Sequence, residues 1–363
     1  STSSAYGSGG GGGSGYDRSG TGGNSGTAGS LADATGDYGQ AGVVVIRYAG
    51  PDAASGGTES TITANGVDYR VHTFTSSSSF AINSFSAALS GTISGAGALT
   101  IDASGGAMTL SGSSTYTGST TLAGGALKAD SSAALGSGSA VTLNNVSGAS
   151  LTLLRDLSVG SLAGSGTTGG HIALGGNTLT AGGNNTSTTY AGVISGVGSL
   201  IKQGTGILTL TGANTYSGTT IVSAGTLAVT NAAGLGSTAA GTAVASGAVL
   251  DLQGIAVGGE ALSLNGGTLS TSTGTSSLSG AVALGADSTV AVAGSGLTLS
   301  GLVSGTGSGI TKTGVGALTL SGANTYAGGT SVSAGILRAG VSSAGNVTSG
   351  AFGTSTITVS SGA

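Results

Sequence analysis

The sequence predicts an all-β protein whose main part is a right-handed parallel β-helix, that is, a β-solenoid. Three observations support this prediction. Glycine makes up 77 of the 363 residues and charged residues only 6%, so small and β-branched side chains dominate. Short segments alternate apolar and polar residues, as half-buried strands do. A nine-residue segment recurs three times, and repeats too small to bury their own apolar face stack on one another.

A glycine-rich segment covers residues 1–42 and includes an unbroken glycine run at 9–13. Such composition is typical of a flexible linker. The alternative is an ordered bundle of extended polyglycine strands, because glycine has no Cβ and lets backbones approach closely. The sequence leaves both interpretations open.

A small β module is predicted at residues 43–88. Residues 43–48 form an apolar strand pattern, and Pro51, the only proline, follows in a turn. Residues 67–74 alternate apolar and polar side chains, which predicts a half-buried strand. A further strand is expected to begin at Phe80.

Residues 89–363 are predicted to form the solenoid, with three super-repeats of about 100–110 residues. Three segments align without gaps and each ends in a tyrosine: 108–116, 208–216 and 318–326. A second strand follows each copy: 126–129, 226–229 and 336–339. With about 20 to 25 residues in each coil and about 4.8 Å between coils, we expect about 11 to 14 coils.

The repeat also carries a family resemblance. Residues 206–220, followed by 223–227, resemble the autotransporter-associated β-strand repeat of Gram-negative autotransporter passengers and large bacterial surface proteins. The resemblance implies a parallel β-helix exposed outside a cell of Gram-negative type. It implies no particular activity, because the repeat is a scaffold. The N-terminal region, with its glycine-rich tract and strand 43–48, looks like modules of bacterial surface fibres and phage tail proteins.

The first copy departs from the other two at the same positions of the repeat. Ser114 stands where the later copies have an asparagine, Asn214 or Asn324. At such a turn we expect asparagine to adopt the left-handed conformation and to bond its own backbone. Asp102 stands where the later copies have Lys202 or Lys312, which indicates a worn or edge repeat.

Composition excludes several classes of partner. The net charge is −4 without a basic cluster, which argues against nucleic acid and against electrostatic membrane binding. No apolar run approaches the ~20 residues of a membrane helix, so no membrane insertion by this segment is expected. The chain has no cysteine and therefore no disulfide framework.

We predict no catalytic, cofactor-binding or metal-binding residues, and no enzymatic activity. The 12 acidic residues are not spaced to converge on one strand face, as the carboxylates of a β-helix enzyme do. Asp33 and Asp37 indicate a solvated turn rather than a metal site. His72 and His171 are not clustered with other ligands.

The repeated tyrosines, Tyr116, Tyr216 and Tyr326, have two interpretations. They form an exposed binding stripe, or they cap the same turn in each super-repeat. Capping is the interpretation that we favour.

These features predict an extracellular structural or adhesive surface protein: a spacer, or a filament subunit assembling end to end with copies of itself. Other expected partners are a cell-surface glycan or another surface protein. The alternatives are a glycan-binding module and, less favoured, a glycan-acting β-helix fibre enzyme. Because the sequence starts at Ser1 and stops partway through a repeat, we expect a processed form or a segment of a longer protein.

Overall fold

The computed structural model describes residues 3–8, 43–49, 54–55, 58–64, 67–74, 79–82, 86–164, 166–341 and 350–360. Most of the glycine-rich segment lies outside these ranges, so both interpretations of it stay predictions. The chain forms two compact units. Unit 1 comprises residues 1–184 and 191–193, and unit 2 comprises residues 185–190 and 194–363.

Unit 1 begins with a four-stranded antiparallel sheet in the order β1-β2-β5-β4. Its strands are β1 (Ser3–Ser8), β2 (Val43–Ala49), β4 (Thr58–Ala64) and β5 (Val67–Phe74). Strand β5 coincides with the segment whose apolar and polar residues alternate in the sequence.

The rest of unit 1 is mainly a stack of parallel strands. They are β3 (Ala54–Ser55), β6 (Ser79–Ile82), β7 (Ser86–Leu89), β8 (Leu99–Leu110), β9 (Thr120–Ala129), β10 (Ala140–Leu143), β11 (Ser150–Leu153), β12 (Leu157–Val159), β13 (Ser161–Gly164), β14 (His171–Ala173) and β15 (Thr178–Ala181). The long strand β9 pairs in parallel with β8, β10 and β11. Among the described strands of this stack, β3 pairs antiparallel with β6.

Unit 2 consists of three parallel sheets. The first contains β18 (Ser199–Lys202), β20 (Thr220–Val222), β22 (Thr242–Ala245), β25 (Leu262–Asn265), β28 (Val282–Ala286) and β31 (Val303–Ser304). The second contains β16 (Thr188–Tyr190), β19 (Ile207–Leu210), β21 (Thr226–Val229), β23 (Val249–Leu252), β26 (Thr268–Thr271), β29 (Ser288–Val292), β32 (Ile310–Thr313), β34 (Thr330–Val332) and β36 (Ile357–Val359). The third contains β24 (Ala256–Val257), β27 (Thr275–Leu278), β30 (Gly296–Leu299), β33 (Ala317–Leu320) and β35 (Ile336–Ala339). Strand β17 (Ile194–Ser195) precedes β18.

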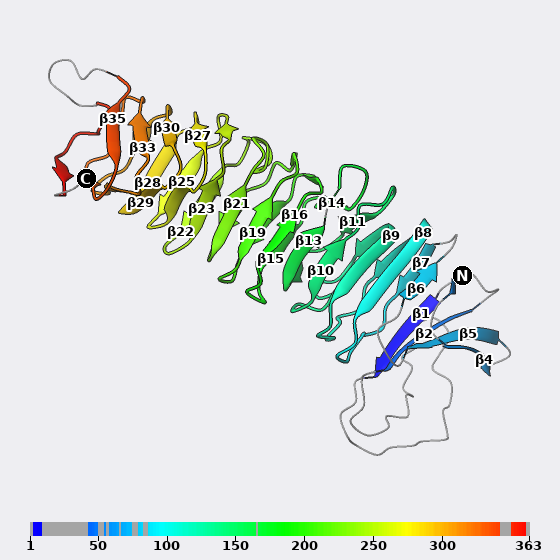
Figure 1. Cartoon of the computed structure of the whole chain (residues 1–363). Helices are drawn as coiled ribbons and strands as arrows, with labels where there is room; N and C mark the ends of the chain where they lie inside the picture. The colour runs from blue at the N-terminus through cyan, green and yellow to red at the C-terminus, as the bar shows by residue number, and fades with distance from the viewer. Residues whose placement is uncertain are drawn as a thin grey trace. The chain divides into compact units, whose positions relative to one another are not determined.

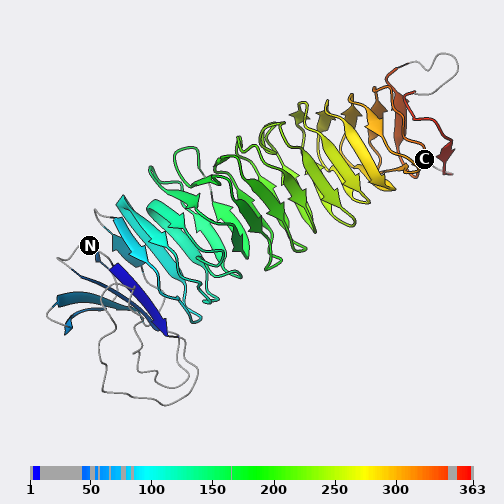
Figure 2. The same cartoon turned by 180° about the vertical axis from the view of Figure 1, so that it is seen from behind.

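The strands of unit 2 lie side by side along a common direction, as Figure 1 shows for β19, β21 and β23 and Figure 2 shows from behind. In the first sheet Thr220 pairs with Thr242, Thr242 with Leu262, and Leu262 with Val282. Each coil of the stack therefore takes 20 to 22 residues. This coil is too short to enclose a core alone, so each coil buries its inward side chains against the next.

Inward side chains form apolar columns because a strand alternates its faces with a period of two residues. In the second sheet Leu227, Leu250, Leu269 and Val290 are paired in successive coils and all are buried. Each fully buried aliphatic side chain contributes about 1.5–3 kcal/mol relative to an exposed one. The prediction of an all-β parallel solenoid is confirmed, with about 12 turns and no α-helix among the described residues.

The second and third super-repeats occupy different sheets of unit 2. Strand β18, which begins the second copy, belongs to the first sheet, whereas the equivalent β32 belongs to the second sheet. Likewise β19 lies in the second sheet and its equivalent β33 in the third. Equivalent residues of the two copies therefore point in different directions around the stack.

Candidate functional site

The three repeated tyrosines are buried at corners of the solenoid. Tyr116 is 2% exposed, and Tyr216 and Tyr326 are fully buried. Each phenol hydroxyl is hydrogen-bonded to the threonine four residues later, with O–O distances of 2.5 Å for the second and third copies. Burial raises the pKa of Tyr116 to about 12, because the phenolate would lose its hydration. The interpretation of these tyrosines as an exposed binding stripe was therefore wrong. They close turns inside the structure.

A glycine lies against each of these tyrosines. Gly136, Gly236 and Gly353 all have positive φ angles, of 65°, 84° and 74°. A Cβ on Gly236 would lie 2.5 Å from the carbonyl oxygen of Tyr216 and 3.1 Å from its ring. These glycines belong to the Leu-Gly or Phe-Gly motif downstream of each copy, so the motif and the tyrosine form one packing unit.

The repeat asparagines connect neighbouring coils. Asn214 Oδ1 accepts a hydrogen bond from the backbone N–H of Ile194 at 2.8 Å, and its Nδ2 donates to the carbonyl of Gly234 at 2.6 Å. Asn324 makes the same pair of contacts with Val303 and Ala351. The expectation of a left-handed asparagine was wrong, because neither residue has a positive φ. The buried side chain instead satisfies backbone groups of the coils before and after it.

Two lysines lie inside the apolar columns. Lys202 is 1% exposed and is paired with Val222 in the next coil, where both face inward. Its Nζ donates to the carbonyls of Gln203, Gly204 and Ala224 at 2.9, 2.8 and 3.2 Å. All three ammonium donors are therefore used. Burial lowers the pKa of Lys202, because the charged form loses hydration.

Lys312 repeats this arrangement in the third copy. It is fully buried, and its Nζ donates to the carbonyls of Thr313, Gly314 and Ala334 at 2.8, 2.7 and 3.0 Å. Burial lowers its pKa as well. Both lysines thus fasten a turn of their own coil to the following coil.

In the first copy Ile101 takes the inward position of Lys202: it is buried and pairs with Leu122, as Lys202 pairs with Val222 in the second copy. The Asp102 carboxylate accepts hydrogen bonds from the backbone N–H and the hydroxyl of Ser104. Strand β8 runs through this region, and its pairing with β9 shifts register on both sides of Ala103. The expectation that Asp102 replaces the lysine was therefore wrong, because the first copy has one more residue between this strand and its tyrosine.

Glu260 is a buried acid in unit 2, with 2% of its surface exposed. Its Oε1 accepts a hydrogen bond from the Thr242 hydroxyl at 2.7 Å. Within the described part of the chain, no donor reaches Oε2. Burial raises the pKa of this carboxyl, and the hydrogen bond from Thr242 opposes that rise.

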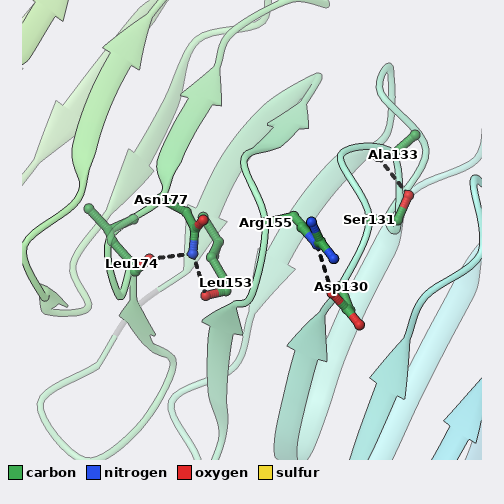
Figure 3. Close-up of polar contacts among 7 residues, drawn as sticks. All are labelled: Asp130, Ser131, Ala133, Leu153, Arg155, Leu174 and Asn177. Atoms are coloured by element: carbon green, nitrogen blue, oxygen red, sulfur yellow. Dashed lines mark hydrogen bonds and ion pairs between the residues drawn. The ribbon is translucent and has the colours of Figure 1, made fainter.

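Polar contacts also link coils at the surface of unit 1, as Figure 3 shows. Asn177 Nδ2 donates to the carbonyls of Leu153 at 2.9 Å and Leu174 at 3.3 Å. Arg155 Nε lies 3.2 Å from Asp130 Oδ1, and both side chains are exposed. An ion pair so accessible to water contributes about 0–1 kcal/mol.

The remaining sequence candidates form no recognisable site. His171 Nδ1 accepts a hydrogen bond from the Val193 N–H at 3.1 Å, which serves the backbone of unit 1. Asp33, Asp37 and the side chain of His72 lie outside the described residues. In the part of the chain that the structure describes, no three His, Cys, Asp or Glu residues gather where they could hold a metal ion. No helix among those residues could span a membrane.

An open pocket of about 220 Å³ lies on the outer side of unit 2. Hydroxyl groups, glycine backbone and one carboxylate line it: Asp287, Gly309, Thr311, Ser331, Thr356 and Thr358 are among its residues. No lining residue is basic. Asp287 Oδ1 accepts the backbone N–H of Gly309 at 2.8 Å. Its lining offers hydrogen-bonding groups to a small polar ligand.

Comparison with known proteins identifies the repeats. The family model described as passenger-associated-transport-repeat matches residues 92–129, 200–229 and 310–339. The second and third matches contain the buried lysine, the bridging asparagine and the corner tyrosine. The chain thus carries three copies of this passenger-associated repeat.

One curated relative is the adhesin BmaC autotransporter of Brucella suis biovar 1 (strain 1330). It is 44% identical over 141 residues, which is 38% of this chain and 4% of that protein. The chain thus spans a small fraction of the relative's length. No solved structure matches the chain.

Sequence reasoning missed three groups that the structure places: the buried lysines, Glu260 and the polar pocket. A signal for the lysines was present, because Leu200 and Lys202 are two residues apart and share the inward face of β18. Glu260 had no such signal, since it lies outside a strand. The pocket joins residues from coils about 20 residues apart, which no local pattern reveals.

Proposed function

We propose that this chain is a non-enzymatic, adhesive and structural part of a surface protein of a Gram-negative cell. The main support is the match of three segments to the passenger-associated repeat. At the solenoid corners, polar residues of this repeat hold neighbouring coils together. The relative named as an adhesin supports the adhesive role. The polar residues of the repeat hold neighbouring coils together, which supports a scaffold that carries binding surfaces.

Attachment to host-type surfaces tests the adhesive role. Beads coated with the full chain are incubated with cultured epithelial cells, and bound beads are counted with and without excess soluble chain. We expect attachment above that of albumin-coated beads, with soluble chain competing for it. Attachment equal to that of albumin beads would remove the adhesive part of the proposal.

We further propose that copies of the chain assemble end to end. Strands β35 and β36 of unit 2 carry exposed apolar side chains: Ile336 is 48%, Ile357 44% and Val359 61% exposed. Strand edges with unpaired backbone groups recruit further strands, and apolar side chains add to that association. A second copy of this chain would cover them.

Electron microscopy across a concentration series tests assembly. Uniform filaments that appear as concentration rises are expected. A matched variant, Ile357→Lys with Val359→Lys, places charges on β36 and is expected to abolish filaments without altering the circular dichroism spectrum. Particles that stay single at every concentration would contradict end-to-end assembly and would leave adhesion to its own test.

A further inference from the structure

The open pocket of unit 2 is built on a ladder of outward hydroxyl groups. Thr311 of β32 pairs with Ser331 of β34, and Ser331 pairs with Thr358 of β36. These residues share the outer face of the second sheet, so their hydroxyls recur at about the 4.8 Å spacing of neighbouring strands. Ser331 is half-buried and Thr358 is exposed. A hydroxyl both donates and accepts, so the ladder presents alternating hydrogen-bonding capacity to one ligand.

A carboxylate stands at the corner beside this ladder. Asp287 Oδ1 is occupied by the Gly309 N–H, and this contact fixes the carboxylate at the pocket wall. The side chain is exposed, which leaves its other oxygen accessible to a ligand's hydroxyl groups. An ionised acceptor makes hydrogen bonds about twice as strong as a neutral one.

Bare backbone forms the adjoining wall. A Cβ on Gly309 would lie 2.6 Å from the carbonyl oxygen of Gly329, and one on Gly328 would lie 2.3 Å from the Gly309 nitrogen. Side chains are therefore excluded from this corner. Glycine at these positions leaves this part of the pocket wall as bare backbone.

We infer that this pocket binds one ring of an uncharged carbohydrate. This inference rests on the proposed adhesive function and names its ligand class. Hydroxyls and a carboxylate complement the vicinal hydroxyls of a sugar. With a carboxylate and no basic residue in its lining, the pocket disfavours an anionic sugar or a phosphate. Its volume of about 220 Å³ lies below the ~300–1,000 Å³ of sites for larger ligands, which suits a single ring.

Saturation-transfer NMR and calorimetry on the full chain test this pocket. The probes are glucose, galactose, mannose and N-acetylglucosamine, with glucuronic acid as the anionic comparator. We expect at least one neutral sugar to bind and glucuronic acid to bind more weakly. Failure of every neutral sugar, or preference for glucuronic acid, overturns the proposal.

Variants locate the binding. Thr311→Val with Thr358→Val removes two hydroxyls at nearly constant shape and is expected to weaken sugar binding about tenfold. Asp287→Asn keeps an oxygen for Gly309 but removes the charge, and it should also weaken binding. The matched control Thr268→Val changes the same outer face on β26, away from the pocket lining, and should leave affinity unchanged.

Two results would show that sugar binds elsewhere and would overturn the site. One is wild-type affinity in the double variant, and the other is a loss of affinity in Thr268→Val as large as that in the double variant. The bead assay remains a separate test. Beads that attach to cells although the purified chain binds no sugar would leave the adhesive function intact and remove only the pocket proposal.

Discussion

At the residue scale, the buried lysines show how a cation is kept inside an apolar column. The aliphatic stem of Lys312 occupies a position in the column that continues from Val290 to Val332. Its ammonium reaches three turn carbonyls, which replace water. The arrangement is self-contained, because no carboxylate is needed to hold the charge.

Replacing Lys202 by methionine tests this account. Lys202→Met keeps the stem but leaves the carbonyls of Gln203, Gly204 and Ala224 without their donor. We expect the local free energy of opening to fall by about 2 kcal/mol. Amide hydrogen exchange measures it, and Lys128→Met, at an exposed position, is the control. Unchanged protection from amide exchange in Lys202→Met would mean that water hydrogen-bonds to the turn carbonyls in place of the ammonium group.

Glu260 makes the stability of unit 2 depend on pH. Its pKa is raised above the ordinary value of 4.5 by burial, so the folded state favours the protonated acid. Its contribution to stability is complete below pH 4.5 and is lost as the pH rises through the raised pKa. The pKa of Tyr216 is raised by burial and, to a lesser extent, by the Glu260 charge, so Tyr216 stays neutral in this range.

Thermal unfolding between pH 4 and pH 8 measures this dependence. We expect Glu260→Gln, which has no charge to bury, to flatten the decrease in stability on the alkaline side. Glu59→Gln, on β4 of unit 1, is the control for general charge effects. Identical pH profiles for wild type and Glu260→Gln would contradict the assignment.

At the element scale, the corner formed by a tyrosine and a glycine is the recurring unit that turns one strand into the next. Tyr216 provides the packed ring and the hydroxyl bond to Thr220, and Gly236 provides the left-handed turn that lies on the ring. The strands themselves are only three or four residues long here. The corners therefore determine where each strand begins.

Alanine substitutions at Gly236 and Gly247 distinguish the cost of a steric collision from the cost of a strained φ angle. Gly236→Ala suffers both a strained φ of 84° and a collision with Tyr216. Gly247→Ala has a similar φ of 75° but meets nothing within 4 Å. We expect Gly247→Ala to cost about 1 kcal/mol and Gly236→Ala at least about 2 kcal/mol more. Urea unfolding measures the difference in the free energy of unfolding between the two variants. Equal losses would show that the Tyr216 ring moves aside to admit the added Cβ.

At the scale of the whole molecule, a stacked array responds locally to damage, because each coil contacts only its neighbours. Lys202→Met should therefore lower exchange protection in β18 and β20. Strands β30 and β33 of the same unit, several coils away, should keep theirs. Exchange measured by mass spectrometry distinguishes this from cooperative loss across unit 2, which would argue for a single folding unit.

The parallel stack was predictable because period-two alternation and three ungapped copies are properties of the sequence itself. Which sheet each copy occupies was not predictable, because it depends on the accumulated number of residues in all preceding coils. The local preference of asparagine for left-handed turns suggested the wrong role for Asn214, since bridging backbone groups of two coils outweighed it. The charge of Lys202 concealed its inward position, because lysine is rarely buried.

The difference in length between coil and super-repeat protects the chain from pairing errors during folding. If successive coils were identical, they would pair equally well at any offset. A strand displaced by one coil would then cost no free energy. Here coils of 20 to 22 residues sit within copies spaced 100 and 110 residues apart, so each coil meets a neighbour of different sequence. A one-coil slip would separate Lys202 from the Ala224 carbonyl and leave its charge poorly compensated. The buried lysine thus disfavours any order of coils other than the native one.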